Sequence, residues 1–204
     1  PYAGYAGSKG DILICHNDDE YTNAIRMLKK QGYKEVLLQQ LLDDPEQEEI
    51  GLMGMTLKRG QIVIPGIIHK IRSYPIGKGS TSYAKFSPGI REISEEKIKQ
   101  FISSTGYVGV FDVEMIKAYG KYWFIEINYR NGQYGYTPTA AGYNLPANWV
   151  YGMNDDKVEK VHKLKEIYYI NEREDYRHVK DGTISLKEWM KEFRMASACG
   201  MYCS

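Results

Sequence analysis

Hydrophobic and polar residues alternate along two runs near the middle of the chain, residues 107–116 and 121–128. Alternation of this kind is typical of β-strands, because successive side chains point to opposite faces of a sheet. A short stretch containing Gly120 separates the runs, which indicates a hairpin. Phe111 and Val113 lie on the face that a sheet would bury. The pattern therefore predicts a hairpin with one apolar face.

The other face of this hairpin carries acids. Asp112 and Glu114 are two residues apart on the first strand, and Glu126, Asn128 and Arg130 follow the same spacing on the second. Each set therefore shares one face of its strand. If the two faces coincide, carboxylates and an amide gather beside a guanidinium, and oxygen donors of this kind suit Mg²⁺. The alternative interpretation is a hairpin whose charged face is simply solvated.

The motif formed by Glu126, Asn128 and Arg130, with Glu114 on the preceding strand, resembles the metal-binding signature of the ATP-grasp superfamily. The resemblance implies that Glu114, Glu126 and Asn128 hold Mg²⁺ against the phosphates of ATP. It also implies that Arg130 faces the acceptor of the phosphoryl group. Asp112 is the alternative to Glu114 as the ligand from the first strand, and we rank Glu114 above it.

The resemblance implies an α+β fold of the ATP-grasp type, with antiparallel sheets and flanking helices, of which this chain holds a part. The implied activity is that of an ATP-dependent ligase. Mg²⁺ and ATP convert a small-molecule carboxylate into an acyl phosphate, which an amine then attacks. The alternatives are an enzyme similar to carbamoyl-phosphate synthetase that acts on bicarbonate, and a nucleotide-binding fragment that is inactive on its own.

Glycine is frequent in residues 1–10, where Ser8 and Lys9 also lie. Backbone amides at glycines can approach a polyanion closely. Since this stretch precedes the acidic hairpin, it resembles the ATP-grasp flap that folds over the phosphates, and Ser8 and Lys9 become candidate nucleotide contacts. In the family, two nucleotide-binding lysines and a substrate-binding domain come before this loop. We therefore expect an N-terminal domain of the same parent protein as a partner of this chain.

A helix is predicted after Asn17 or Asp18, either of which can cap it, and is expected to end near Gly32. Residues 34–42 then form an apolar run that leads into the turn-forming residues 43–45. A short apolar run bounded by turn residues indicates a buried strand.

By resemblance, this strand is the hinge between the two lobes of an ATP-grasp module, where backbone groups contact the adenine. Gln39, Gln40 and Leu42 fall on the adenine-contacting positions. Glu49, which opens the next strand, is our candidate for contact with the ribose hydroxyls, with Glu48 as the alternative.

Residues 51–57 and 61–70 predict a second hairpin that turns at 58–60. Its return strand leads into residues 73–88, which are rich in Gly, Ser, Tyr and Lys. Such a composition is typical of a surface loop. By resemblance, this loop lies where the phosphates and the acceptor substrate meet. The candidate anion contacts there are Lys70, Arg72 and Lys85.

The remaining elements surround these two hairpins. A helix is expected from Ser94 to about Ser103, with Ile98 and Phe101 packed inward. The other expected elements are an irregular Gly-rich segment at 131–138, a helix within 142–151, an amphipathic helix over 155–166, a strand at 167–170 and a final helix opened by a capping box at 185–188.

These elements suggest three regions. Residues 1–42 are the remainder of a small lobe, residues 43–153 are a large lobe that contains the metal hairpin, and residues 154–204 are a C-terminal helical appendage. The end of the chain, residues 199–203, lacks the cysteine spacing of a redox or zinc site and is expected to be a frayed terminus.

Composition excludes several other functions. The formal net charge is +1, and no long run of Lys or Arg occurs, which argues against a nucleic-acid partner. No apolar run is long enough to span a membrane. The three cysteines have no metal-type spacing, so reduced thiols and a cytoplasmic location are expected. A homodimer is compatible with the resemblance.

Overall fold

The computed structural model of the chain describes residues 13–200, except 77, 78 and 92. The chain divides into two compact units, Pro1–Pro45 and Glu46–Ser204, close to the first of the two expected boundaries. Ser8 and Lys9 lie outside the described residues.

The first unit contains the helix that the sequence predicted. Helix α1 spans Asp18–Lys30, and the side chain of Asn17 accepts a hydrogen bond from the backbone N–H of Glu20 at 2.9 Å. The predicted buried strand over 34–42 is wrong, because this stretch has no regular structure and Leu37 is 85% exposed. A strand needs a neighbouring strand to accept and donate its backbone hydrogen bonds. The described residues of this unit contain no strand with which residues 34–42 could pair.

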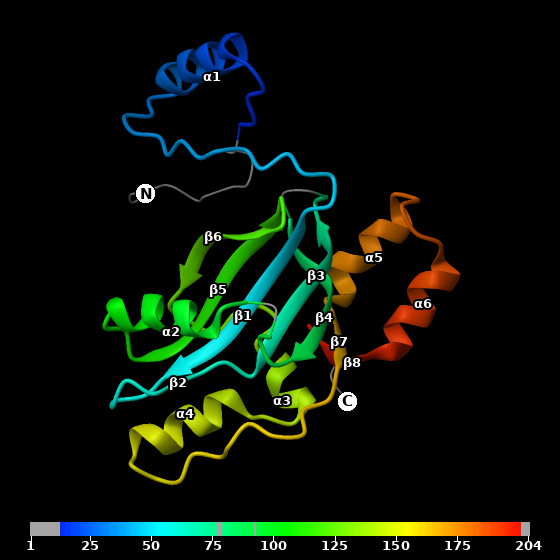
Figure 1. The fold of residues 1–204 in the computed structure, drawn as a ribbon. Coiled ribbons are helices and arrows are strands. Elements are labelled where there is room, and N and C mark those ends of the chain that lie inside the picture. Colours follow the sequence, from blue (N-terminus) through cyan, green and yellow to red (C-terminus); the bar gives the residue numbers. More distant parts are fainter. Residues whose placement is uncertain (1–12, 77–78, 92, 201–204) are drawn as a thin grey trace. The chain divides into compact units, whose positions relative to one another are not determined.

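The second unit is built on an eight-stranded sheet with the order β6-β5-β1-β3-β4-β7-β8, in which β2 also pairs with β1 (Figure 1). All neighbouring strands are antiparallel except β7 and β8. The mostly antiparallel sheet with flanking helices confirms the predicted α+β class. The strands are β1 Glu48–Thr56, β2 Ile62–Val63, β3 Gly66–Tyr74, β4 Ser80–Pro88, β5 Gly109–Ala118, β6 Lys121–Asn128, β7 Ile167–Ile170 and β8 Ala196–Cys199.

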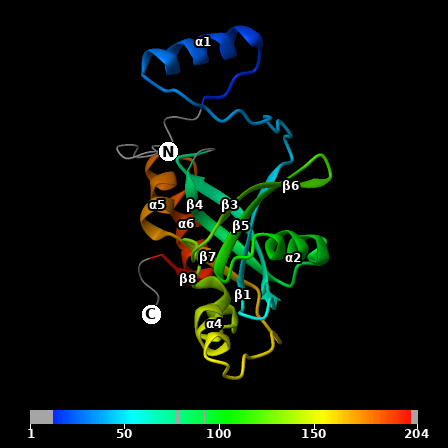
Figure 2. The ribbon, with the colours of Figure 1, turned by 90° about the vertical axis from the view of Figure 1, so that its left-hand side faces the viewer.

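Within the described residues of this unit, five helices accompany the sheet: α2 Glu95–Ser104, α3 Thr137–Ala141, α4 Leu145–Met153, α5 Glu172–Lys180 and α6 Leu186–Met195. In the view turned by 90°, α2 lies on one side of the strands and α5 and α6 lie on the other (Figure 2). None of the described helices has the length and apolar character needed to cross a membrane.

Two apolar cores position the acidic hairpin between them. The face of the sheet that carries Glu114 and Glu126, called the acidic face below, continues into a core with Met53 and Leu145, which α3 and α4 cover. The opposite face buries Val113 against α2. The hairpin is therefore packed against α2 on one face, while Glu126 on the acidic face stays exposed.

Helix α2 begins where predicted, with Ser94 as its N-cap. Ile98 is buried as expected, whereas Phe101 is 37% exposed and contacts the ring of Phe124 at 4.8 Å between centroids. Ile102, which lies one turn beyond Ile98, takes the buried position.

The second predicted hairpin is confirmed, since β1 pairs with β2 and β3 around the turn at 58–60. The predicted surface loop over 73–88 is wrong, because Ser80–Pro88 forms strand β4 between β3 and β7. Tyr83 and Phe86 of this strand are buried. The polar composition of residues 80–88 does not reveal that β4 is an inner strand, paired with β3 on one side and β7 on the other.

The C-terminal residues differ most from expectation. The predicted helix over 155–166 is wrong, because these residues have no regular structure and are tied to α4, with the N–H of Glu159 donating to the Asn148 side chain at 2.7 Å. Strand β7 and the helix opened by Ser185 are confirmed. Helix α5 was not predicted, and Cys199 belongs to strand β8 rather than to a frayed end. Residues 154–204 thus add two strands to the central sheet.

Candidate active site

The acidic residues of β5 and β6 face each other across the hairpin. Glu114 lies opposite Glu126, and Asp112 lies opposite Asn128. The two strands are joined by a two-residue turn whose residues have positive φ, as type I′ hairpins require. The predicted convergence of acids on one face is therefore present.

A bulge produces this alignment. Near the turn the ladder pairs Met115 with Phe124, but beyond Ile125 the register shifts so that Glu114 pairs with Glu126. In an unbulged ladder with the same turn, Glu114 would lie opposite Ile125 and Glu126 opposite Val113, on the other face. Nothing in the alternating pattern indicated this extra residue.

Asn128 connects the two glutamates. Its amide nitrogen donates to Glu126 at 3.0 Å and lies 3.4 Å from a carboxylate oxygen of Glu114. Its amide oxygen accepts from the Arg130 guanidinium at 3.2 Å, and Arg130 also donates to the carbonyl of Asn131. Four of the predicted site residues thus form one hydrogen-bonded chain.

Lys70 joins the cluster from β3. Its ammonium group donates to Glu114 and lies 3.6 Å from a carboxylate oxygen of Glu49. The Lys70 side chain is only 9% exposed, whereas that of Glu114 is 29% exposed. Glu49, predicted to contact a ribose, therefore lies beside Lys70 on the acidic face.

Asp112 has a different environment from Glu114. It is 3% exposed and accepts a hydrogen bond from the Tyr134 hydroxyl at 2.9 Å. Burial raises the pKa of Asp112 to about 6, the Tyr134 hydrogen bond opposes this rise, and the nearby Glu114 adds to it. The Asp112 carboxyl is therefore engaged in holding Tyr134.

Tyr134 is the residue of the site that sequence reasoning missed. It lies in the predicted irregular segment after β6 and is 3% exposed. A Cβ atom at Gly51 would lie 2.3 Å from its hydroxyl, and one at Gly132 would lie 2.4 Å from Asp112. The available signal was this pair of glycines, which admit the close approach of other groups.

Other predicted residues lie elsewhere. Arg72 donates to Asp175 of α5 at 2.7 Å and to Glu192 of α6 at 2.6 Å, so it belongs to a largely buried ion cluster and not to the acidic face. Lys70 lies opposite Ala84, so the next residue, Lys85, points to the other face, where it pairs with Glu166 at 2.9 Å. Gln39, Gln40 and Leu42 lie in the extended part of the first unit.

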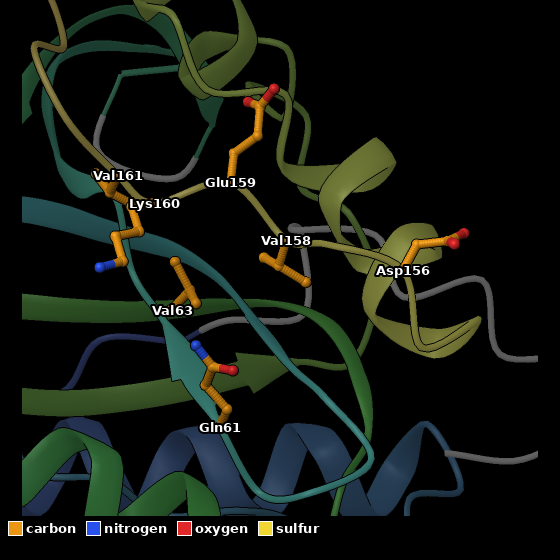
Figure 3. Close-up of a pocket in the computed structure, with 7 residues that line it drawn as sticks. All are labelled: Gln61, Val63, Asp156, Val158, Glu159, Lys160 and Val161. Carbon is orange, nitrogen blue, oxygen red and sulfur yellow. The ribbon is translucent and has the colours of Figure 1, made fainter.

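A shallow pocket of about 450 Å³ lies between the start of β2 and the extended segment 156–161 (Figure 3). Val63 and Val158 line it together with polar side chains. It contains none of the predicted site residues. Within the described residues, no three His, Cys, Asp or Glu side chains form a ready metal-binding group. The acidic face instead interleaves carboxylates with an ammonium and an amide.

No family model and no curated protein matches the sequence. Solved structures do match the fold. N5-carboxyaminoimidazole synthetase from Staphylococcus aureus, complexed with ADP, has a TM-score of 0.64 at 15% identity, over 87% of this chain and 47% of that one. The ATPase subunit of phosphoribosylaminoimidazole carboxylase from Aquifex aeolicus has a TM-score of 0.56 at 17% identity, over 76% of this chain and 54% of that one.

The biotin carboxylase domain of 2-oxoglutarate carboxylase from Hydrogenobacter thermophilus, in complex with MgADP, ADP and bicarbonate, has a TM-score of 0.57 at 19% identity, over 80% of this chain and 38% of that one. The chain thus spans about half or less of the length of these proteins. All three are ATP-grasp enzymes. The chain therefore has the fold of the ATP-grasp superfamily, in agreement with the resemblance of its acidic hairpin.

Proposed function

We propose that the chain is part of an ATP-dependent ligase that binds Mg-ATP on the acidic face and activates a carboxylate as an acyl phosphate for attack by an amine. The observation that carries this proposal is the hydrogen-bonded set of Glu114, Glu126, Asn128 and Arg130. It lies on a sheet with the ATP-grasp fold, and the S. aureus and H. thermophilus neighbours contain ADP or MgADP.

The donor set fits Mg²⁺. Glu114 and Glu126 offer carboxylate oxygens from facing positions. The Asn128 amide nitrogen lies between them, and its amide oxygen, which accepts from Arg130, becomes a third donor when the amide turns over. Magnesium commonly takes one or two carboxylates and completes its shell with water and phosphate oxygens. Asp112 is less suitable as a ligand because it is buried and already accepts from Tyr134. We therefore assign the role of first-strand ligand to Glu114.

When bound, Mg²⁺ would neutralise phosphate charge and align the transferred group. Two cationic side chains would bind the substrate and compensate the remaining negative charge. Arg130, fixed by Asn128 and a backbone carbonyl, presents a planar guanidinium that suits a carboxylate or an acyl phosphate. Lys70 supplies an ammonium group that is largely shielded from solvent and lies beside Glu114. Positioning and charge compensation of this kind need no covalent protein nucleophile.

Bicarbonate is the second candidate for the activated acid. The H. thermophilus domain was solved with bicarbonate and MgADP together, and the same structure is described as a dimer, which also supports a homodimeric assembly here. An enzyme that activates bicarbonate in this way would be similar to carbamoyl-phosphate synthetase. Consumption of ATP with bicarbonate and ammonia, compared with amino acids, separates the two candidates.

The test is a calorimetric titration with a non-hydrolysable ATP analogue, with and without Mg²⁺, on this chain and on a form extended upstream. Glu126→Gln removes one carboxylate charge, so we expect it to weaken Mg²⁺-dependent binding about 10- to 100-fold, the range for disturbed metal sites. Because Glu126 is exposed, the melting temperature should change little.

Glu166→Gln is the matched control, since Glu166 is a half-exposed acid paired with Lys85. We expect it to bind like the wild type. Equal binding by Glu126→Gln and Glu166→Gln would contradict the assignment of the acidic face as the nucleotide site. Binding by the extended form alone would identify the chain as an incomplete site.

A further inference from the structure

Lys70 reaches across a whole strand to contact Glu114. In the sheet, β1 lies between β3, which carries Lys70, and β5, which carries Glu114. The position of β1 opposite Glu114 is Gly51, which has no side chain to stand between them. The long lysine stem can therefore cross β1 to the far carboxylate, while Glu49, directly opposite Lys70, lies 3.6 Å from the same ammonium group.

We propose that the ammonium group of Lys70 occupies the cation position beside Glu114 until Mg²⁺ binds there, and then pairs with the oxygens of the bound phosphates. This inference rests on the proposed function, because it concerns the same site. In the absence of nucleotide, Lys70 competes with the metal ion for the Glu114 carboxylate. Lys70 therefore has a regulatory role.

The first step of the argument is burial. Lys70 is 9% exposed at its side chain, and removing an ammonium group from water is costly unless acids compensate it. Glu114 and Glu49 provide that compensation. A cation that binds Glu114 in place of Lys70 leaves the ammonium group with Glu49 as its remaining carboxylate neighbour in the described part of the chain.

The second step is charge. Mg²⁺ and an ammonium group compete for the same carboxylate oxygens, so free metal must displace Lys70 from Glu114. A nucleotide changes this balance, because its phosphates offer the displaced ammonium new oxygen partners. Metal and nucleotide therefore assist each other's binding through Lys70, which makes the site selective for the metal–nucleotide complex over free metal.

The experiment compares Mn²⁺, a spectroscopic substitute for Mg²⁺, bound to the full chain with and without the non-hydrolysable ATP analogue. Free Mn²⁺ is counted by electron paramagnetic resonance. Without nucleotide, Lys70→Met should bind Mn²⁺ roughly three- to tenfold more tightly than the wild type, since the largely buried competing ion pair with Glu114 is gone. With Mn²⁺ present, the same variant should bind the analogue roughly three- to tenfold more weakly.

Two variants control for side effects. Lys85→Met removes the same charge from the other face, where Lys85 pairs with Glu166, and should change neither affinity. Lys70→Arg keeps a cation beside Glu114 and should keep Mn²⁺ binding without nucleotide near the wild-type value. If Lys70→Met folds poorly, Lys70→Gln takes its place. Compared with Lys70→Arg, Lys70→Gln should bind Mn²⁺ more tightly without nucleotide and bind the analogue more weakly when Mn²⁺ is present.

Unchanged or weaker Mn²⁺ binding by Lys70→Met and Lys70→Gln would overturn the inference and leave the proposed function intact. Absence of Mn²⁺ and nucleotide binding in the wild type, in this chain and in a form extended upstream, would overturn the proposed function itself. Opposite changes in the two affinities, as described, are the outcome that supports metal competition, because a purely structural lysine would weaken both.

Discussion

Asp112 and Glu114 illustrate how two carboxylates on one face of one strand acquire different chemistry. Glu114 is partly exposed and surrounded by cationic and amide donors, whereas Asp112 is buried under the segment after β6. Burial disfavours the charged form of a carboxyl. The two residues are equivalent in the alternating sequence pattern, so their difference arises entirely from the tertiary structure.

This difference predicts a pH dependence of stability. The pKa of Asp112 rises from the ordinary value of 3.8 to about 6, so between these values the folded protein retains a proton that the unfolded chain releases. Stability should therefore fall as pH rises from about 4 to 6 and level off above. Asp112→Asn should flatten this profile and raise the free energy of unfolding at pH 7 by about 1–3 kcal/mol.

Chemical denaturation in metal-free buffer between pH 4 and 8 measures the effect. Tyr134→Phe is the companion variant, because it removes the hydroxyl that donates to Asp112 and should raise the Asp112 pKa further. A wild-type profile that rises with pH across this window, with Asp112→Asn unchanged, would show that Asp112 is ionised in the folded protein.

The site residues that the sequence predicted correctly as neighbours are Glu114, Glu126, Asn128 and Arg130, all on one hairpin. Their proximity follows from local spacing, which a sequence displays. Lys70 required the pairing of β3 with β1, and Tyr134 required the glycines of two separate segments. Arg72 was misplaced because its partners lie on helices more than a hundred residues later.

At the scale of elements, capping signals and strand periodicity were reliable. Asn17, one of the two predicted candidates, caps α1, and Ser185 caps α6 as predicted. The hairpin of β5 and β6 has its predicted limits almost unchanged. The failures, at 34–42, 73–88 and 155–166, all concern segments whose state depends on distant partners. Residues 155–166 have helical spacing, yet hydrogen bonds to Asn148 and Ala141 hold them in an irregular conformation.

Arg72 links the helices α5 and α6 to the sheet. Asp175 is completely buried and accepts from Arg72 and from Ser82. Arg72→Met would leave this carboxylate without its cation, so we expect a loss of about 3–5 kcal/mol in the free energy of unfolding. Urea denaturation at neutral pH measures this loss.

Arg59→Met is the control for the Arg72 variant. The side chain of Arg59 is 89% exposed and lies 3.7 Å from Asp155, so its removal should cost no more than about 1 kcal/mol. Similar losses in the two variants would mean that the buried cluster contributes no more than a surface pair.

At the scale of the molecule, the C-terminal residues complete the main sheet. Ile167 and Tyr169 of β7 and Ala198 of β8 belong to the same core as Met53 and Leu145. The expected division after residue 153 cuts through this core. Residues 154–204, whose sequence is charged and predicts helices, therefore contribute to the core that lies next to the acidic face.

A chain that ends at Met153 should consequently fail to fold cooperatively. It loses β7 and β8 and exposes the buried side of β4, including Phe86. Exposed sheet edges and apolar surface favour aggregation. Circular dichroism and urea titration of the truncated chain test this, and a sharp transition with the wild-type slope would show that residues 154–204 are dispensable.

The bulge at Ile125 also bears on how such proteins are found. Because one extra residue on β6 restores the alignment of Glu114 with Glu126, a hairpin one residue shorter and without the bulge would align the same two glutamates. Insertions and deletions near the hairpin tip are thus compatible with an intact site. A search pattern with a fixed spacing between the two glutamates would overlook such relatives, whereas one that lets the spacing vary by a residue would retain them.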